Sequence, residues 1–183
     1  RKTTDDERLS YERIMANLSI DEDITTSRVG VNGVPAEWIS APESAPGRVI
    51  LYLHGGGYVI GSVRTHRALT AHLARAARSR ILAIDYRLAP EFPFPAPVED
   101  AVSSYQWLLA QGISPTKIVI PGDPSGGGLV VATLVALKNV GEPMPGAGVC
   151  ISPWVDMEAT GRSYTSNAEV DPSGSRPRIL QLA

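Results

Sequence analysis

Two glycine-rich segments hold the residues of this chain that are best suited to chemistry. They are His54-Gly55-Gly56-Gly57 and Gly122-Asp123-Pro124-Ser125-Gly126-Gly127. Backbone N–H groups of a glycine loop can stabilise the oxyanion that forms when an ester carbonyl is attacked. A G-x-S-x-G turn between a strand and a helix presents the serine that attacks. The glycines of that turn are present, but its central residue is Pro124, so the two segments predict an acyl-transfer site with an altered nucleophile position.

Two further segments complete an ordered set of motifs. They are Asp85-Tyr86-Arg87-Leu88-Ala89-Pro90-Glu91 and Ser152-Pro153-Trp154-Val155-Asp156. Each motif alone is weak, because short glycine turns are common, but four motifs in this order are specific. By these motifs the chain resembles the hormone-sensitive-lipase family of carboxylesterases, which have the α/β-hydrolase fold. The resemblance implies hydrolysis of short-chain acyl esters through a serine acyl-enzyme, and we expect no cofactor and no metal.

The resemblance also assigns roles within the two glycine-rich segments. Gly56 and Gly57 match the oxyanion donors of the family, and the backbone N–H of Ser125 matches the third donor. A loop that needs glycine only for close backbone approach is the alternative interpretation. The supporting loop residues are expected to be His54, Gly55 and Asp123. His54 is also a conceivable base, but the family position supports the loop rather than moving protons.

Pro124 is the decisive departure from the family pattern. The nucleophile elbow is a strained turn with positive φ, and the proline ring holds φ near about −65°. The change therefore removes the hydroxyl and disfavours the turn. No insertion or deletion separates the glycines, so Ser125 could be a displaced nucleophile only if the turn shifted by one residue. That shift would place Asp123 where the elbow needs a glycine.

The residues that would activate a serine are also lacking. No histidine follows His72, and the acids beyond the altered turn are Glu142, Asp156, Glu158, Glu169 and Asp171. Asp156 matches a family segment beside the site that does not supply the triad acid. Without a base, a serine hydroxyl is a weak nucleophile at neutral pH. His66 and His72 fall on different faces of one predicted helix, which excludes a simple shared metal site, and surface or packing roles are expected for both.

The elements that position these segments alternate between strand and helix. Residues 24–31 and 34–40 flank Asn32-Gly33, a strong hairpin turn. From residue 48 onward, strands that are apolar throughout alternate with helices, which predicts a parallel sheet with helices on both faces and ligand-binding loops at the carboxyl ends of the strands. The expected strands are 49–53, 81–84, 117–120 and 147–151, and the expected helices are 65–78, 98–110 and 127–139.

Two regions outside this alternation complete the predicted organisation. Residues 5–18 have helical apolar spacing, and the resemblance assigns such a helix to a cap over the site. Residues 41–47 form a connector too short to link domains. We therefore divide the chain into 1–45, the cap helix and first hairpin, and 46–183, an incomplete α/β-hydrolase core, which together form one structural domain. The proline-rich segment 85–96 is expected to shape the loop under the site through an Arg/Glu-type pairing.

The bulk composition is that of an ordinary globular protein. The chain has 183 residues, of which 43% are hydrophobic and 20% charged, and a net charge of −2. Without a run of lysine or arginine it carries no electrostatic footprint for nucleic acid. No apolar stretch is long enough to span a bilayer and no signal core begins the chain, so a cytoplasmic location is expected. Cys150 has no partner for an internal disulfide and is expected to be a buried strand residue.

The sequence also predicts that this chain is the amino-terminal part of a longer protein. It begins with Arg1 and stops inside a predicted helix, and the last two strands of the family, which carry the triad acid and histidine, are missing. We expect an impaired or inactive enzyme. The alternatives are a non-catalytic module that holds a small ligand at Gly56, Gly57 and Tyr58, and a non-functional truncation product. The open edge of the last strand predicts self-association.

Overall fold

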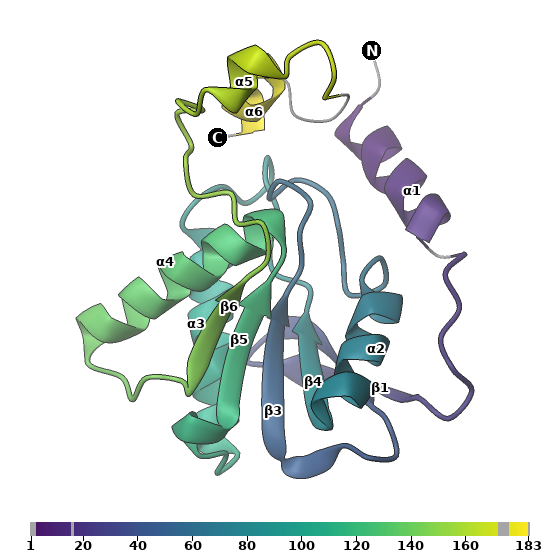
Figure 1. Ribbon diagram of the computed structural model, residues 1–183. Helices are drawn as coiled ribbons and strands as arrows, with labels where there is room; N and C mark the ends of the chain where they lie inside the picture. Colours follow the sequence, from purple (N-terminus) through teal and green to yellow (C-terminus); the bar gives the residue numbers. More distant parts are fainter. Residues whose placement is uncertain (1–2, 16, 172–175, 183) are drawn as a thin grey trace.

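The computed structural model describes residues 3–15, 17–171 and 176–182. Its centre is a six-stranded sheet in the order β1-β2-β4-β3-β5-β6 (Figure 1). Neighbouring strands from β3 to β6 run parallel, and the antiparallel β1–β2 hairpin joins them through β4. This arrangement confirms the predicted hairpin and four parallel strands. The strands are β1 (Thr25–Val31), β2 (Val34–Ser40), β3 (Ala45–Leu53), β4 (Ser79–Ile84), β5 (Ile118–Gly122) and β6 (Ala147–Cys150).

Helices cover both faces of the sheet, so the central strands are buried on both sides. Helix α2 (Arg67–Ala77) packs on one face, and α3 (Ala96–Ala110) and α4 (Pro124–Val140) pack on the other (Figure 1). Each face has its own apolar core, one with Tyr105 and Leu129, the other with Ala71 and Ala74. The remaining short elements are η1 (Pro115–Lys117), α5 (Ser163–Ser166) and α6 (Arg176–Leu182).

The first hairpin turns at the predicted residues. Asn32 and Gly33 have φ of 50° and 91°, the pair of left-handed conformations that a two-residue hairpin turn requires. The connector predicted at 41–47 is shorter than expected, because β3 already begins at Ala45. Ala45 pairs with Ser79, and the register then shifts before Val49. A bulged strand start therefore occupies part of the predicted connector.

Strand β6 lies at the edge of the sheet and pairs with β5. All four of its residues are exposed, and the side chain of Val149 is 45% exposed. The prediction that Cys150 is buried is wrong, since the cysteine is exposed. An apolar strand sequence indicates burial only where neighbours cover it, and no described strand pairs with the outer side of β6. The apolar surface of this edge is therefore open.

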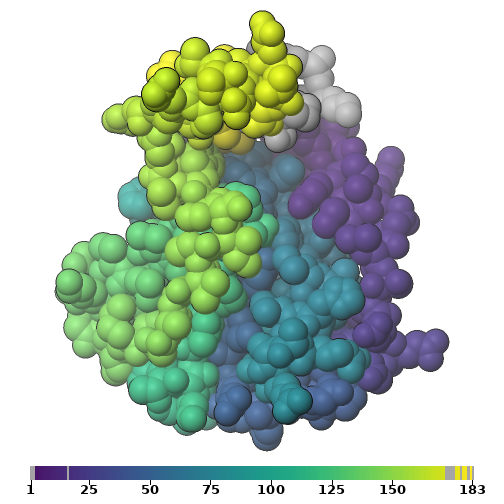
Figure 2. All heavy atoms as spheres, viewed as in Figure 1, coloured from purple at the N-terminus to yellow at the C-terminus, as the bar shows by residue number. Residues whose placement is uncertain are grey.

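Helix α1 (Thr4–Met15) confirms the predicted amino-terminal helix, but it docks through polar contacts. It has no buried residue, and Leu9 and Ile14 are 56% and 64% exposed. Arg8 donates hydrogen bonds of 2.8 Å to the carbonyls of Val59 and Ala89 and forms a two-pronged ion pair with Glu91. The helix lies at the same end of the molecule as the carboxyl-terminal helices (Figures 1 and 2). The exposed side chains of Leu9 and Ile14 do not hold it there.

Candidate active site

The two glycine-rich segments meet at the carboxyl end of the sheet. The first follows β3 and the second joins β5 to α4, and these strands are neighbours in which Leu53 is opposite Gly122. The start of α4 approaches β3 so closely that a Cβ on Gly126 would lie 2.0 Å from the Leu53 carbonyl oxygen. Glycine is therefore required at this position. The predicted association of the two segments is present in the fold.

Asp123 connects the two segments through its carboxylate. It accepts hydrogen bonds from the Tyr52 hydroxyl at 2.7 Å and from the Gly55 N–H at 2.9 Å, and His66 Nε2 lies 3.1 Å from its other oxygen. Burial alone would raise the pKa of Asp123, but the hydrogen bonds from His66, Tyr52 and Gly55 outweigh burial and lower it. Asp123 is thus ionised at neutral pH and holds the glycine loop against the end of β5.

His66 is a site residue that sequence reasoning missed. Its side chain is buried beside Asp123, and its ring centre lies 5.5 Å from that of His54 and 6.1 Å from that of Tyr52. His66 immediately precedes α2, so the helix-face comparison with His72 did not apply to it. The surface role expected for His72 is confirmed by its exposure. A histidine just before a helix that follows the glycine loop was the signal available.

His54 is enclosed beneath the glycine loop. It is 2% exposed, its ring stacks on Tyr86 with centres 4.3 Å apart, and Nδ1 lies 2.8 Å from the Gly55 carbonyl. Burial lowers the pKa of His54 to about 4, so the ring is neutral at physiological pH. Within the described residues Nε2 has no hydrogen-bond partner. A neutral enclosed ring is suited to supporting the loop.

The glycines expected to form the oxyanion hole have the backbone of a tight loop. Gly56 and Gly57 have φ of 123° and 62°, and a Cβ on Gly56 would lie 2.0 Å from the Ile60 carbonyl oxygen. The Gly57 N–H donates a hydrogen bond of 2.9 Å to the Ser125 hydroxyl oxygen. One of the two glycine donors is therefore already bound to a side chain of the protein itself.

Pro124 begins α4 directly, without an elbow. Asp123 is extended, with φ −110° and ψ 163°, and Pro124 is the first helical residue, where its missing N–H removes no helical hydrogen bond. No left-handed residue lies between Gly122 and Ser125, all of which are described, as the restricted φ of proline leads one to expect. The one-residue shift considered for Ser125 is not seen. Its side chain is fully buried in the first turn of α4.

The Arg/Glu-type pairing expected for segment 85–96 is made with neighbouring helices. Arg87 binds Asp100 and Glu99 of α3 at 2.8 and 2.9 Å, and Glu91 binds Arg8 of α1. The segment is thus held from both sides. The sequence shows that this segment has charged residues of both signs, but it does not show which residues pair with them.

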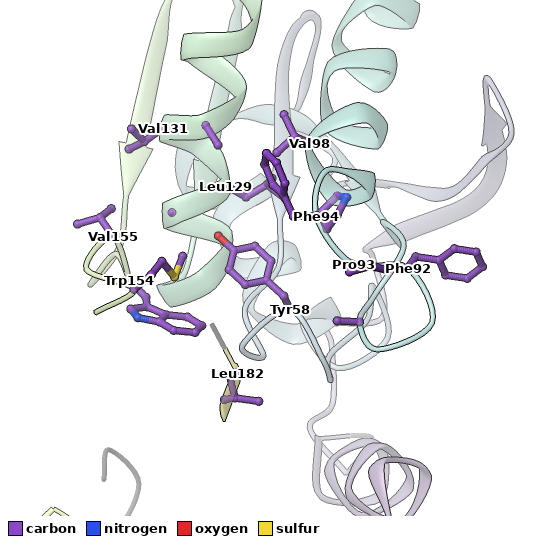
Figure 3. A pocket seen from close by; sticks show the side chains of 15 residues that line it. Tyr58, Phe92, Pro93, Phe94, Val98, Leu129, Val131, Trp154, Val155 and Leu182 are labelled. Carbon is purple, nitrogen blue, oxygen red and sulfur yellow. The ribbon is translucent and has the colours of Figure 1, made fainter. Parts of the chain in front are cut away.

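An apolar cavity of about 500 Å³ lies beside the glycine loop (Figure 3). Tyr58 and Trp154 line it with ring centres 5.9 Å apart, and Leu129 of α4 and Leu182 of α6 contribute to its wall. In Figure 3 the Tyr58 hydroxyl points toward α4, and Leu182 lies below the ring. Leu182 Cδ1 is 3.0 Å from where a Cβ on Gly57 would be, so the cavity borders Gly57.

The chemical character of the cavity is that of a pocket for a small apolar group. Burial raises the pKa of the Tyr58 hydroxyl to about 12, so the phenol stays protonated and can donate a hydrogen bond. In the part of the chain that is described, no group of three or more His, Cys, Asp or Glu side chains is placed to hold a metal ion. Helices long and apolar enough to cross a membrane are likewise absent from the described residues.

Comparison with known proteins places this site in a family. A family model for the alpha/beta hydrolase fold matches residues 50–181. An acetyl-hydrolase from Streptomyces hygroscopicus is 45% identical over 163 residues, which are 87% of this chain and 53% of that protein. A crystal structure of an esterase from the bacterial hormone-sensitive lipase family is 62% identical with a TM-score of 0.97, covering 100% of this chain and 61% of that one. EstE5 soaked with p-nitrophenyl butyrate is 45% identical, with a TM-score of 0.93 over 100% of this chain and 60% of that one.

The chain therefore belongs to the α/β-hydrolase fold family, and within it to the hormone-sensitive-lipase group. This confirms the family resemblance and the fold class that the motifs predicted. The chain spans about half the length of the curated relative just described (53%) and about three fifths of the matched solved structures (61%).

Proposed function

We propose that this chain carries the ester-binding part of a carboxylesterase that acts on short-chain acyl esters, and that the chain alone hydrolyses esters poorly or not at all. The observation that carries the proposal is the altered turn: Pro124 stands at the first position of α4, and Ser125 is buried behind it. The names of the relatives, which are acetyl-hydrolases and esterases, support the substrate class.

The expected defect follows from the chemistry of acyl transfer. Pro124 has no nucleophilic atom, so the family position cannot form an acyl-enzyme. The Ser125 oxygen is buried and accepts the Gly57 N–H, so a carbonyl carbon cannot reach it in this structure. The double change Pro124→Ser with Ser125→Ala should restore little activity, because an oxyanion hole with an unassisted hydroxyl provides only a residual share of catalysis.

Hydrolysis of p-nitrophenyl butyrate by the purified chain tests this proposal. We expect a rate equal to that of the Ser125→Ala variant, which serves as the serine-free control. A rate above the control that Ser125→Ala abolishes would refute the proposal, because it would identify Ser125 as a working nucleophile after all.

A second candidate function is ligand binding without turnover, and the apolar cavity favours it. The cavity is large enough for a short acyl group, and its wall combines the Trp154 ring with the Tyr58 hydroxyl donor. A non-hydrolysable acyl compound such as N-(4-nitrophenyl)butanamide should then raise the unfolding temperature of the chain in a saturable way. Trp154→Ala should abolish that shift, while His72→Ala, on the exposed surface, should keep it. If the compound does not raise the unfolding temperature of the unaltered chain, a non-functional truncation product is the better interpretation.

A further inference from the structure

The Ser125 hydroxyl is enclosed and bound to the glycine loop. It accepts the Gly57 N–H at 2.9 Å, and the neighbouring Tyr86 hydroxyl donates to the His54 carbonyl at 2.6 Å. Ser125 and Tyr86 are 0% and 2% exposed. The Gly57 N–H and the Ser125 hydroxyl are thus hydrogen-bonded inside the protein, at the position where a complete esterase would receive a substrate oxygen.

The direction of the Gly57 N–H is set by the loop around it. The N–H groups of Val59 and Ile60 donate to the Gly56 carbonyl at 3.1 and 3.0 Å, and the Gly55 N–H is held by Asp123. Gly57 itself has a left-handed φ of 62°. A donor fixed on both sides cannot turn toward a new acceptor. An acceptor must therefore take the position along the N–H direction that the Ser125 oxygen now occupies.

We propose that the Ser125 hydroxyl is a built-in occupant of the Gly57 donor and excludes the carbonyl oxygen of an ester or amide from it. An incoming carbonyl would have to break the Gly57–Ser125 bond and leave the serine oxygen buried without its donor, which is costly. The inference rests on the proposed function only for the class of ligand, a short acyl compound. It assigns Ser125 a role opposite to that of a nucleophile.

The cavity identifies where the excluded ligand would lie. Tyr58, the chain neighbour of Gly57, lines the cavity, and so does Leu182, whose Cδ1 is 3.0 Å from where a Cβ on Gly57 would be. The proposal places the carbonyl of an acyl chain held there at the Gly57 N–H. Removing the Ser125 hydroxyl would leave the Gly57 N–H as a free donor facing that carbonyl. Ser125→Ala is therefore expected to gain a binding contact rather than lose one.

Nuclear magnetic resonance of the Gly57 amide tests the proposal directly. In the unaltered chain, N-(4-nitrophenyl)butanamide should leave the Gly57 amide signal in place, and this amide should exchange slowly with solvent. In Ser125→Ala, its exchange should speed up roughly tenfold, and the compound should shift the signal saturably. Tyr86→Phe is the matched control, since it removes a neighbouring hydroxyl but leaves the Gly57–Ser125 bond, and it should behave as the unaltered chain.

Three results would overturn the proposal. They are a Gly57 signal that moves equally with and without Ser125, exchange that is unchanged by Ser125→Ala, and rapid exchange of Gly57 in the unaltered chain. The last measurement needs no variant, so it decides the matter even if Ser125→Ala does not fold. Ester turnover is not a readout in this experiment. Failure here and hydrolysis in the p-nitrophenyl butyrate assay are therefore separate outcomes.

Discussion

The buried ring of His54 makes the stability of this protein depend on pH in a defined window. The folded protein keeps His54 neutral down to about pH 4, whereas an unfolded chain protonates it near the ordinary value of 6.5. Between these values the unfolded state binds more protons, so the free energy of unfolding falls as the pH falls. The contribution is fully present above about pH 6.5. At pH 4.5 the difference between the folded and unfolded pKa values of His54 corresponds to a loss of about 2–3 kcal/mol in the free energy of unfolding. This is a large part of the stability of a small domain.

Urea unfolding at pH 7.5 and pH 4.5, followed by tryptophan fluorescence, measures this loss. The His54→Gln variant has no titrating ring at this position, so its loss between the two pH values should be smaller than that of the unaltered chain by about 2–3 kcal/mol. His72→Gln is the matched control, because His72 is exposed and its removal should leave the full loss in place. Groups that act on His54, namely His66 and Asp123, are unchanged in both variants.

Equal losses in the unaltered chain and in His54→Gln would refute this reasoning. The acid sensitivity would then belong to other groups. Asp123 is one such group, but its lowered pKa places its loss at lower pH, below the ordinary value of 3.8. Asp85 acts in the opposite sense, because burial raises its pKa, so protonation of that carboxyl favours the folded state.

Three further predictions concern the loop, the strand contact and the sheet edge. Asp123→Asn should lower the free energy of unfolding by about 2–4 kcal/mol in denaturant titration, because one amide cannot accept from the three donors that meet this carboxylate. Gly126→Ala should cost more than about 3 kcal/mol or prevent folding, while Gly30→Ala, where a Cβ meets nothing within 4 Å, should change stability by less than about 0.5 kcal/mol. We also propose that the chain self-associates through β6. Val149→Lys should then yield a smaller species in light scattering and raise the reactivity of Cys150 toward a thiol reagent. An unaltered chain that is a monomer with fully reactive Cys150 would contradict this proposal.

Most elements of the fold could be predicted because local signals and tertiary contacts agree. The Asn32-Gly33 turn needs two left-handed residues, and the sequence places there the pair that adopts them most readily. Strands β3 to β5 read as continuous apolar runs because helices cover both of their faces. The amino-acid composition of each such segment therefore indicates its environment in the fold.

The errors arose where the environment depends on segments far away in the sequence. Cys150 sits in a strand as apolar as the others, but exposure at a sheet edge is decided by whether a further strand pairs with it. His66 gained its site role from Asp123, which lies on another loop. The Ser125 contact with Gly57 required the path of the backbone through Pro124, and no motif describes that path.

Because the Arg8 guanidinium docks α1, the positions of this helix differ in the substitutions that they tolerate. Arg8 reaches two carbonyl oxygens and a carboxylate at once, whereas Leu9 and Ile14 face solvent. A library randomised over this helix and selected for a docked amino terminus should keep arginine at position 8 and accept polar residues at positions 9 and 14. Lysine should not substitute for Arg8, because an ammonium is a point charge without the planar fork that makes these bonds together. The exposed apolar positions that help to reveal the helix in the sequence are thus the part that can vary, whereas charged side chains, Arg8 and also Glu12, specify where the helix lies.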